Sequence, residues 1–578
     1  MQGNQVWLQG GDARGAIYAI YSFSDEFLDV PPWWYWAGWK PTTRSKVEIP
    51  AATNRSWQSP QVKWRAWFPN DTDLLSPWIS EDYNARWNLV LETMLRLKLN
   101  LIDVGELSEE TLRKIRLPRD RGVAVTTTHL APFGASLRNW EKFWTVRKRE
   151  PVPPLLLANT KDLEQFWEEH IRLIQKENVE MLWMIGFRGD GDKGFYRTFA
   201  DAPTDDAARA NVVENMLRRQ VALLKRVTGD EAPPMRTVIY DECSDYVAAG
   251  LLHPPEDPSL IWNFTAARRD HFPAADLRNF HAPPGRQLGY YFNIQFTSTG
   301  SHLADGEGPW KMERNHRMVL ESGPSLALSV VNSGNTREFP LSLAAHARMI
   351  WSFSDYDTDA FTKDFCRRYW GPIHGPAVAE LYQDFFDSYW QQREPNLPDF
   401  PRQYIFHDLR IARATRDLLH AATDKEADAK LLDERDTGYF RIIPANGETK
   451  VDAIRAGMSR SAERFAQVSK RCAELSAHLD EQGRPLFDES LRMQAAFMEA
   501  ASRCLAAAAE GYQVRNDRED FLRCMKMAQK EAGAMEGALR TATKPPFEAW
   551  FAKENIFDLK ETRALIDRRV QGKVKPVP

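Results

Sequence analysis

The chain has 578 residues, with 76 Lys and Arg against 80 Asp and Glu and a formal net charge of −4. This length exceeds what a single hydrophobic core supports, so we expect about two to four domains. The near balance of charge gives no electrostatic reason to expect a nucleic acid or an anionic membrane as a partner.

Other classes of protein are also disfavoured. No apolar run reaches about eighteen residues, so we expect no membrane span, and residues 1–7 lack the pattern of a signal peptide. The five cysteines show no CxxC spacing, which argues against a zinc site and a disulfide framework. No motif indicates a catalytic metal or an organic cofactor, and we expect neither.

The first segment, residues 1–55, predicts a tight turn followed by a helix. A glycine-rich turn at residues 10–15 (GGDARG) precedes apolar residues at helical spacing, and an aromatic stretch follows at residues 32–39 (PWWYWAGW). The segment has too few strands for a complete α/β domain. We therefore expect the remnant of a small N-terminal α/β domain, in a chain trimmed at its N-terminus.

Residues 56–372 alternate strand and helix signals, which predicts an α/β fold with a (β/α)8 TIM-type barrel. The predicted strands are residues 63–68, 100–104, 123–128, 181–187, 237–240, 260–263, 288–292 and 326–331. Eight βα units in series close into a barrel through right-handed crossovers. Active sites of this fold gather at the carboxyl ends of the strands, so the polar residues just after each strand are the site candidates.

Residues 373–578 change to long segments at helical period, for example residues 450–479 and 489–515. These segments are rich in Ala, Leu, Glu, Lys and Arg, with Pro and Gly mostly at the joints. We predict an α-helical bundle of about four to six helices packed against the barrel.

The clearest candidate site begins at residues 181–192 (MLWMIGFRGDGD), where an apolar strand passes into a loop of glycine and charge. The glycines allow a sharp turn that keeps Arg188, Asp190 and Asp192 close together. The next predicted strand ends in Glu242. Neighbouring parallel strands would place Asp192 beside Glu242, and such a pair can act as general acid and base on a glycosidic bond.

Each of these candidates has a structural alternative that the sequence leaves open. A strand-end acid can serve as a helix cap or an ion-pair partner, so Asp190 can brace its loop and Asp241 can point into the sheet packing. Arg188 can bind an anionic sugar through its planar fork, or neutralise Asp190 and Asp192. His129 can contact a sugar or be a satisfied structural histidine.

Uncharged amide side chains follow several of the other strands. They are Asn70, Asn263, Asn293, Gln295 and Asn335. Sugar hydroxyls suit such groups, although ordinary turn chemistry also explains them. Together with Arg188, Asp190 and His129 they form the predicted substrate-binding set, and Asp192 and Glu242 form the predicted catalytic pair.

A series of short motifs, taken in order, resembles glycoside hydrolase family 115. The motifs are GGDARG at 10–15, the aromatic stretch at 32–39, KWRAWFPND at 63–71, THLAP at 128–132, GFRGDGD at 186–192, IYDE at 239–242, GYYF at 289–292 and VNSGN at 331–335. The resemblance rests on their order and spacing and covers residues 5 to about 370. A helical region follows in the expected place.

Members of that family are xylan α-1,2-glucuronidases, which release glucuronic acid or its 4-O-methyl ether with inversion. The resemblance implies that Glu242 is the general acid, that Asp192 is the base and that Arg188 contacts the substrate. It also implies a plant or algal polysaccharide as partner and a secreted or periplasmic location, and it leaves a homodimer open.

Several positions depart from the family's pattern. Thr72 stands where the family has Glu after Asn-Asp, and His129 lacks the Glu that usually follows within two residues. Asn263, Asn293 and Asn335 replace other polar residues of the family. Three hypotheses therefore remain: an inverting exo-acting α-glucuronidase, the same barrel with another sugar specificity, and a barrel that binds a glycan without cleaving it.

Overall fold

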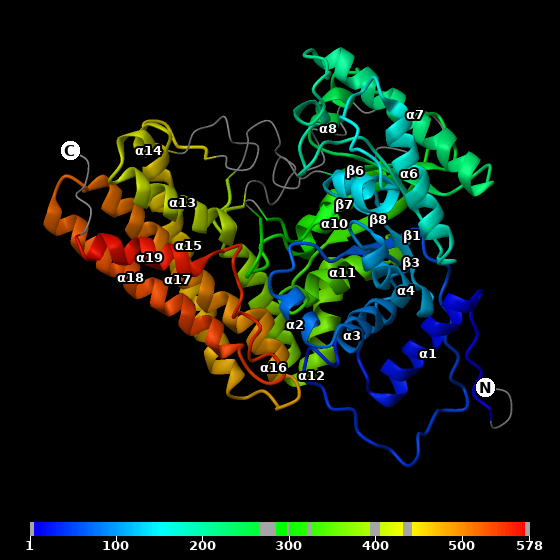
Figure 1. Cartoon of the computed structure of the whole chain (residues 1–578). Helices are drawn as coiled ribbons and strands as arrows, with labels where there is room; N and C mark the ends of the chain where they lie inside the picture. Colours follow the sequence, from blue (N-terminus) through cyan, green and yellow to red (C-terminus); the bar gives the residue numbers. More distant parts are fainter. Residues whose placement is uncertain are drawn as a thin grey trace.

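The computed structural model describes residues 5–265, 285–297, 300–321, 325–392, 405–431 and 442–572. Within these ranges a parallel β-barrel occupies the middle of the molecule, and the helices of the C-terminal part pack along one side of it (Figure 1). No helix in the described part of the chain is both long and apolar enough to cross a membrane.

The eight strands pair in parallel in the order β3-β2-β1-β8-β7-β6-β5-β4. They are β1 (Trp64–Phe68), β2 (Leu101–Asp103), β3 (Ala124–Thr126), β4 (Trp183–Ile185), β5 (Met235–Ile239), β6 (Leu260–Thr265), β7 (Leu288–Asn293) and β8 (Leu326–Asn332). A parallel bridge between Val125 and Met181 joins β3 to the start of β4, and Leu182 N–H donates to the Val125 carbonyl at 2.9 Å. This bridge closes the ring, and the predicted (β/α)8 barrel is confirmed.

Each predicted strand overlaps an observed one, because short apolar runs are typical of strands that are covered on both faces. The side chains inside the barrel form their own apolar cluster, separate from the larger core under the helices. Its buried members are Trp64, Ala66, Phe68, Leu101, Ala124, Leu182, Ile261, Tyr291, Leu328 and Val330. The barrel interior is therefore a packed core, as this fold requires.

Helices follow most of the strands and cover the outside of the barrel (Figure 1). They include α2 (Leu75–Glu81), α3 (Tyr83–Arg96), α4 (Arg113–Asp120), α6 (Thr160–Gln175), α7 (Asp206–Thr228), α8 (Glu242–Ala248), α10 (Gly308–Glu321) and α11 (Pro340–Trp351). Helix α7 shows how the sequence sets their ends. The Asp205 side chain accepts the N–H of Ala208 at the first turn, and Gly229 ends the helix with a φ of +70°.

The C-terminal part is helical, as predicted. Its described helices are α12 (Thr358–Asp387), α13 (Asp408–Ala421), α14 (Lys425–Ala429), α15 (Lys450–Ser476), α16 (Arg484–Phe487), α17 (Met493–Gln513), α18 (Arg518–Thr541) and α19 (Leu559–Val570). Helix α17 packs against α13, α15 and α18, and its many alanines allow this close approach. Helix α12 breaks at Gly371, where φ is +70°, and we propose this break as the boundary between 56–372 and 373–578.

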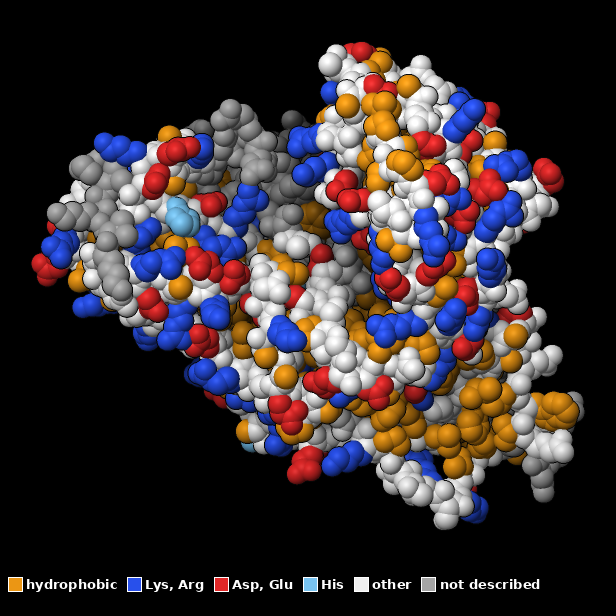
Figure 2. Space-filling model, in the orientation of Figure 1, with side chains coloured by type: hydrophobic (Ala, Val, Ile, Leu, Met, Phe, Trp, Pro, Cys, Tyr) orange, Lys and Arg blue, Asp and Glu red, His pale blue; other side chains and the backbone are white. Residues whose placement is uncertain are grey.

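The N-terminal segment contributes helix α1 (Ala13–Leu28), and the described residues 5–55 hold no regular strand. Apolar side chains gather on the surface around α1 (Figure 2). The aromatic stretch at 32–39 enters the core through Trp33 and Trp36: the Trp36 ring stacks on Phe547 with centroids 5.9 Å apart, and Trp550 lies at its edge. These rings join the two ends of the chain rather than forming an open sugar platform.

A buried ion pair crosses the interior of the barrel. Arg236 on β5 places Nη2 2.5 Å from Oδ2 of Asp103 on β2, and both side chains are 1% exposed. The same nitrogen donates to the carbonyl of Thr127 at 2.8 Å. Burial raises the pKa of Asp103, while the charge of Arg236 opposes this rise. Removing either partner would leave a charge buried without compensation.

We expect Asp103→Asn to lower the free energy of unfolding by about 3–5 kcal/mol, because Arg236 would stay charged inside the barrel. Denaturant unfolding followed by circular dichroism measures the change. Glu48→Gln is the control, because its ion pair with Lys46 joins side chains that are 80% and 76% exposed. This exposed pair should contribute nothing measurable, and equal midpoints for the two variants would contradict the prediction.

Candidate active site

The carboxyl ends of β4 and β5 bring one arginine and three carboxylates together. Arg188, just after β4, donates from Nε to Oε1 of Glu242 at 3.2 Å and from Nη2 to Oε2 at 2.9 Å. Nη2 also lies 3.2 Å from Oδ2 of Asp241, and Nη1 pairs with Asp192. The guanidinium of Arg188 therefore bonds to side chains that follow both β4 and β5, and it links the ends of these two neighbouring strands.

The loop after β4 is shaped by close backbone contacts. Gly186 donates its N–H to Oε1 of Gln220 at 2.9 Å and accepts from Nε2 at 2.8 Å, which anchors the strand end to α7. Gly189 donates its N–H to the carbonyl of Lys193 at 2.8 Å. A Cβ on Gly189 would lie 2.4 Å from Oγ1 of Thr198, so only glycine fits this turn.

The end of β5 turns through an unusual backbone conformation. Asp241 has φ +52° and ψ −123°, a region that residues other than glycine rarely adopt. This turn places Asp241 and the next residue, Glu242, on the same guanidinium. Asp241 therefore faces the strand ends, and the sequence alternative in which it points into the sheet packing is wrong.

Two aromatic rings complete the cluster. His129, after β3, has Nε2 3.2 Å from Oδ1 of Asp192 and Nδ1 3.3 Å from Oγ1 of Thr128. Its ring meets the ring of Tyr240 edge to face, with centroids 5.1 Å apart. The guanidinium carbon of Arg188 lies 4.8 Å from the Tyr240 centroid. Tyr240 thus supports both the imidazole and the cation.

The two predicted catalytic carboxyls have their pKa values shifted in opposite directions. Burial raises the pKa of Glu242; Arg188 opposes this rise and Asp241 adds to it. For Asp192, burial is outweighed by the hydrogen bond and charge of His129 and by Arg188, so its pKa lies below the ordinary value. The Glu242 side chain is 7% exposed and that of Asp192 is 40% exposed. Two carboxyls whose pKa values differ in this way suit one proton donor and one proton acceptor.

Asp190 lies apart from this cluster. Its Oδ1 is 3.7 Å from Nε of Arg138, and its side chain is 56% exposed. Arg138 also reaches Oε1 of Glu106 at 3.3 Å. Among the described residues, the ion pairs of Arg188 go to Asp192, Asp241 and Glu242 and not to Asp190. Asp190 therefore belongs to an exposed rim of charges.

The predicted amides mostly bind other protein groups. Gln295 is fully buried, and its Oε1 accepts the N–H groups of Gly334 and Asn335 at 2.8 and 2.9 Å. Its Nε2 donates to the carbonyl of Asp71 at 2.7 Å. Gln295 thus ties together the loops that follow β1, β7 and β8, and it acts as a structural brace of the barrel mouth.

The other amides differ in their surroundings. Oδ1 of Asn293 accepts Nδ2 of Asn332 at 2.7 Å. Asn263 is fully buried beside β7, and its side-chain atoms find no hydrogen-bond partner among the described residues. A Cβ on Gly289 would lie 2.9 Å from Oδ1 of Asn263. Asn70 is half-buried, and its carbonyl packs so closely on Gly334 that a side chain there would clash.

A second cluster of ionisable side chains at the mouth has no signature in the sequence. Asp73, His302 and Glu554 place their ligand atoms within 4.8 Å of one another, a grouping that could hold a metal ion. Nε2 of His302 lies 3.1 Å from Oδ1 of Asp73, and Asn335 Nδ2 lies 3.4 Å from that same oxygen. Residues 73, 302 and 554 lie far apart in the chain, and no local pattern links them.

The hydrogen bonds around this cluster do not fit metal ligation. Oε1 of Gln295 accepts two N–H groups, which fixes the orientation of the amide. The amide nitrogen Nε2 therefore faces Nδ1 of His302 at 3.1 Å and donates a hydrogen bond to it. His302 then carries its proton on Nε2, toward Asp73. Asp73 also accepts the N–H of Asn555 at 3.1 Å. The cluster therefore fastens the C-terminal segment to the rim of the barrel.

The surface is deeply indented between the part of the molecule that carries α6, α7 and α8 and the C-terminal helices (Figure 2). The carboxyl ends of the strands carry the Arg188 cluster on one side and the Gln295 brace with the Asp73–His302 pair on the other. The arrangement brings carboxyls with raised and lowered pKa values together with hydrogen-bonding groups, a set that can hydrolyse a glycosidic bond.

Comparison with known proteins gives one family. The model described as glycosyl hydrolase family 115 matches residues 57–397, and no curated protein matches the chain. Among solved structures, a family 115 4-O-methyl-α-glucuronidase with specificity for decorated arabinogalactans is similar, with a TM-score of 0.69 and 17% identity. That match covers 96% of this chain and 68% of the other.

Two further solved structures share the architecture. A family 138 enzyme that targets pectin rhamnogalacturonan II has a TM-score of 0.54 at 10% identity, covering 89% of this chain and 67% of its own. A family 89 glycoside hydrolase from Clostridium perfringens, in complex with GlcNAc-α-1,4-galactose, has a TM-score of 0.56 at 10% identity, covering 97% and 63%. At these identities the likeness shows the fold alone.

We expect Arg188→Met to destabilise the protein by roughly 3 kcal/mol near pH 7.5, because three carboxylates would then face one another without a cation. The carboxyl pKa values would rise in this variant, so protonation would relieve the repulsion as the pH falls, and the loss should shrink near about pH 4.5. The midpoints of denaturant unfolding at about pH 7.5 and about pH 4.5 measure this loss of stability. Arg138→Met, at the exposed rim, should leave both midpoints unchanged, and a loss that does not vary with pH would contradict this account.

Proposed function

The chain belongs to glycosyl hydrolase family 115 and is therefore a glycoside hydrolase, and from this premise we propose that it is an exo-acting, inverting α-glucuronidase. It would release a terminal α-linked glucuronic acid, or its 4-O-methyl ether, from a plant or algal polysaccharide. The proposal is carried by one observation: Asp192 and Glu242 meet on the guanidinium of Arg188 at the carboxyl ends of β4 and β5. The opposite directions of their pKa shifts fit a base and an acid. The solved family 115 structure, described as a 4-O-methyl-α-glucuronidase, supports the choice of sugar.

In this proposal Glu242 is the general acid and Asp192 is the general base. Glu242 gives its proton to the glycosidic oxygen as the bond from that oxygen to the anomeric carbon breaks. Asp192 takes a proton from the water whose oxygen bonds to the opposite face of the same carbon, which inverts the configuration. The lowered pKa of Asp192 keeps it ionised, and the raised pKa of Glu242 favours the protonated form that donates.

We assign Arg188 a positioning role, because its fork is already filled by the protein's own carboxylates. The separation of Asp192 and Glu242 is set by one guanidinium and the hydrogen bonds on either side of it. Inversion requires about 6.5–9.5 Å between the two carboxyls and retention about 5–5.5 Å, so the anomer of the first product tests the inverting assignment. His129, through Nε2 on Asp192, would orient the base.

Incubation with glucuronoxylan and with arabinogalactan should release glucuronic acid or its 4-O-methyl ether, and we expect Glu242→Gln and Asp192→Asn to lower kcat at least about 1000-fold. Both variants are nearly isosteric and should keep the fold. Proton NMR of the first product should show the β-anomer if the reaction inverts.

Asp190→Asn is the matched control for these variants. Asp190 lies in the same loop as Asp192 but contacts Arg138 at the exposed rim, so its loss should change kcat only a few-fold. Near-normal activity in Glu242→Gln would remove the acid assignment. Release of a different monosaccharide from these polysaccharides would leave the acid and base assignments standing and would change the proposed sugar.

The pH profile of kcat/KM should be bell-shaped, with its maximum on the acid side of neutrality. Activity requires protonated Glu242, so it falls as pH rises through a pKa above the ordinary 4.5. Activity also requires ionised Asp192, so it falls as pH drops through a pKa below 3.8. Initial rates across the pH range measure both limbs, and activity that keeps rising above about pH 8 would be inconsistent with these roles.

A further inference from the structure

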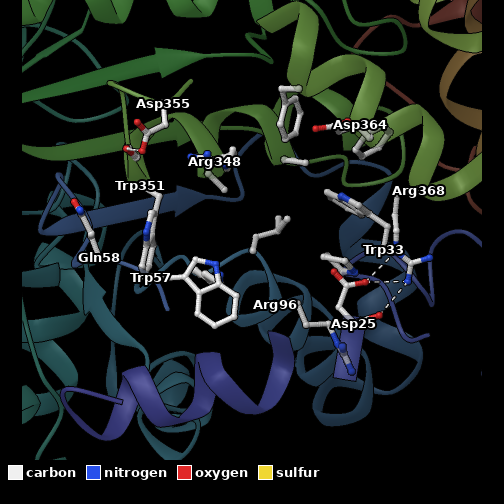
Figure 3. A pocket seen from close by; sticks show the side chains of 18 of the residues that line it. Asp25, Trp33, Trp57, Gln58, Arg96, Arg348, Trp351, Asp355, Asp364 and Arg368 are labelled. Carbon is white, nitrogen blue, oxygen red and sulfur yellow. Dashed lines mark hydrogen bonds and ion pairs between the residues drawn. The ribbon is translucent and has the colours of Figure 1, made fainter. Parts of the chain in front are cut away.

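A cavity of about 550 Å³ lies at the opposite end of the barrel from the Arg188 cluster. Trp57 precedes β1, Lys98 precedes β2 and Trp351 ends α11, so the cavity lies by the amino ends of the strands. Figure 3 shows Trp57 and Trp351 close together on one side, with Arg348 nearby. Its volume falls within the roughly 300–1,000 Å³ that is usual for small-molecule sites.

An ammonium group lies between two tryptophan rings in this cavity. Nζ of Lys98 is 4.6 Å from the ring centroid of Trp57 and 5.3 Å from that of Trp351. Lys98 has a φ of +61°, a backbone conformation rarely adopted outside glycine, Asn and Asp. Trp57 is 49% exposed, so part of its ring remains available to a ligand.

The four cations that line the cavity differ in how their charge is balanced. Arg96 pairs with a glutamate at 2.8 Å, and Arg368 pairs with an aspartate at 2.9 Å. Within the described ranges neither Lys98 nor Arg348 forms an ion pair. Burial, and then the charge of Arg348, lower the pKa of Lys98 to about 8, with Asp25 opposing them. Lys98 and Arg348 thus line one cavity, and each lacks an ion-pair partner among the residues that the structure describes.

Two of the three acids of the cavity have cationic partners, and the third, Asp355, has a hydroxyl partner. Asp25 pairs with Arg368 at 2.9 Å. Asp355 accepts a hydrogen bond from the hydroxyl of Ser352 at 2.9 Å, and Asp364 lies 3.0 Å from Nη1 of Arg367. A hydroxyl does not neutralise a carboxylate, so Asp355 offsets one of the two cations without an ion pair, Lys98 and Arg348, and the lining keeps an excess of positive charge. An added carboxylate would gain charge-assisted hydrogen bonds from both.

We propose that this cavity is a second carbohydrate site, which binds the carboxylate of an acidic saccharide between Lys98 and Arg348. The sugar ring lies against the exposed part of Trp57, since the C–H face of a pyranose is apolar and packs on indole. Gln58 and Ser59, on the same segment as Trp57, line the cavity and offer an amide and a hydroxyl to the sugar hydroxyls. The site holds an acidic polysaccharide chain away from the barrel mouth and takes no part in bond cleavage.

The test is calorimetric titration of the full chain carrying Glu242→Gln with trigalacturonic acid. We expect Lys98→Met and Trp57→Ala each to weaken this binding about ten-fold or more. Arg348→Gln provides a second test of the charge, because Arg348 is exposed and its loss does not endanger the fold. Neutral galactotriose should bind far more weakly than the acidic trimer.

Lys63→Met is the matched control, since Lys63 also lies over a tryptophan, 5.4 Å from the Trp64 ring, but outside this cavity. It should leave the dissociation constant unchanged. Binding that is insensitive to both Lys98→Met and Arg348→Gln, or equal affinity for the neutral trimer, would overturn the proposal. In the catalytically intact chain, Lys98→Met should leave kcat/KM on a small aryl glycoside unaltered, so loss of this site is distinguishable from loss of the active site.

Discussion

The site depends on the contact between Arg188 and the carboxylates of Asp192 and Glu242. These acids follow different strands, and without the guanidinium their charges would repel each other in a partly buried setting. The contact requires β4 and β5 to be adjacent, the sharp turn at Gly189, and the strained backbone of Asp241. Strain of this kind persists only where the surrounding structure enforces it, and here the surrounding barrel supplies that constraint.

The barrel could be predicted from the sequence because its signals are local. Most strands are short apolar runs, and most of the runs are followed by a glycine or a polar residue, as at Gly186 after β4. The same local logic predicted that residues after β4 and β5 meet, and Arg188 and Glu242 do so at 2.9 Å. The roles of acid and base remain predictions, because geometry alone does not measure proton transfer.

Other parts of the site could not be predicted, because they depend on contacts between distant residues. Gln295 has the composition of a sugar-binding amide, but its partners are the backbone of three loops, and only the folded barrel brings those loops together. The pairing of Asp73 with His302 joins positions more than two hundred residues apart. The sequence does not show whether the aromatic stretch at 32–39 is buried, since Phe547, on which Trp36 stacks, lies about five hundred residues further along the chain.

The position of that partner has a consequence for how the protein is made. Trp36 and Trp78 pack against Phe547 and Trp550, and Asp73 receives the N–H of Asn555. During synthesis, the first βα unit therefore leaves the ribosome long before the rings that bury it exist. The nascent barrel must keep these tryptophans from self-association until residues 547–550 have been synthesised, a demand typical of large chains with non-local contacts.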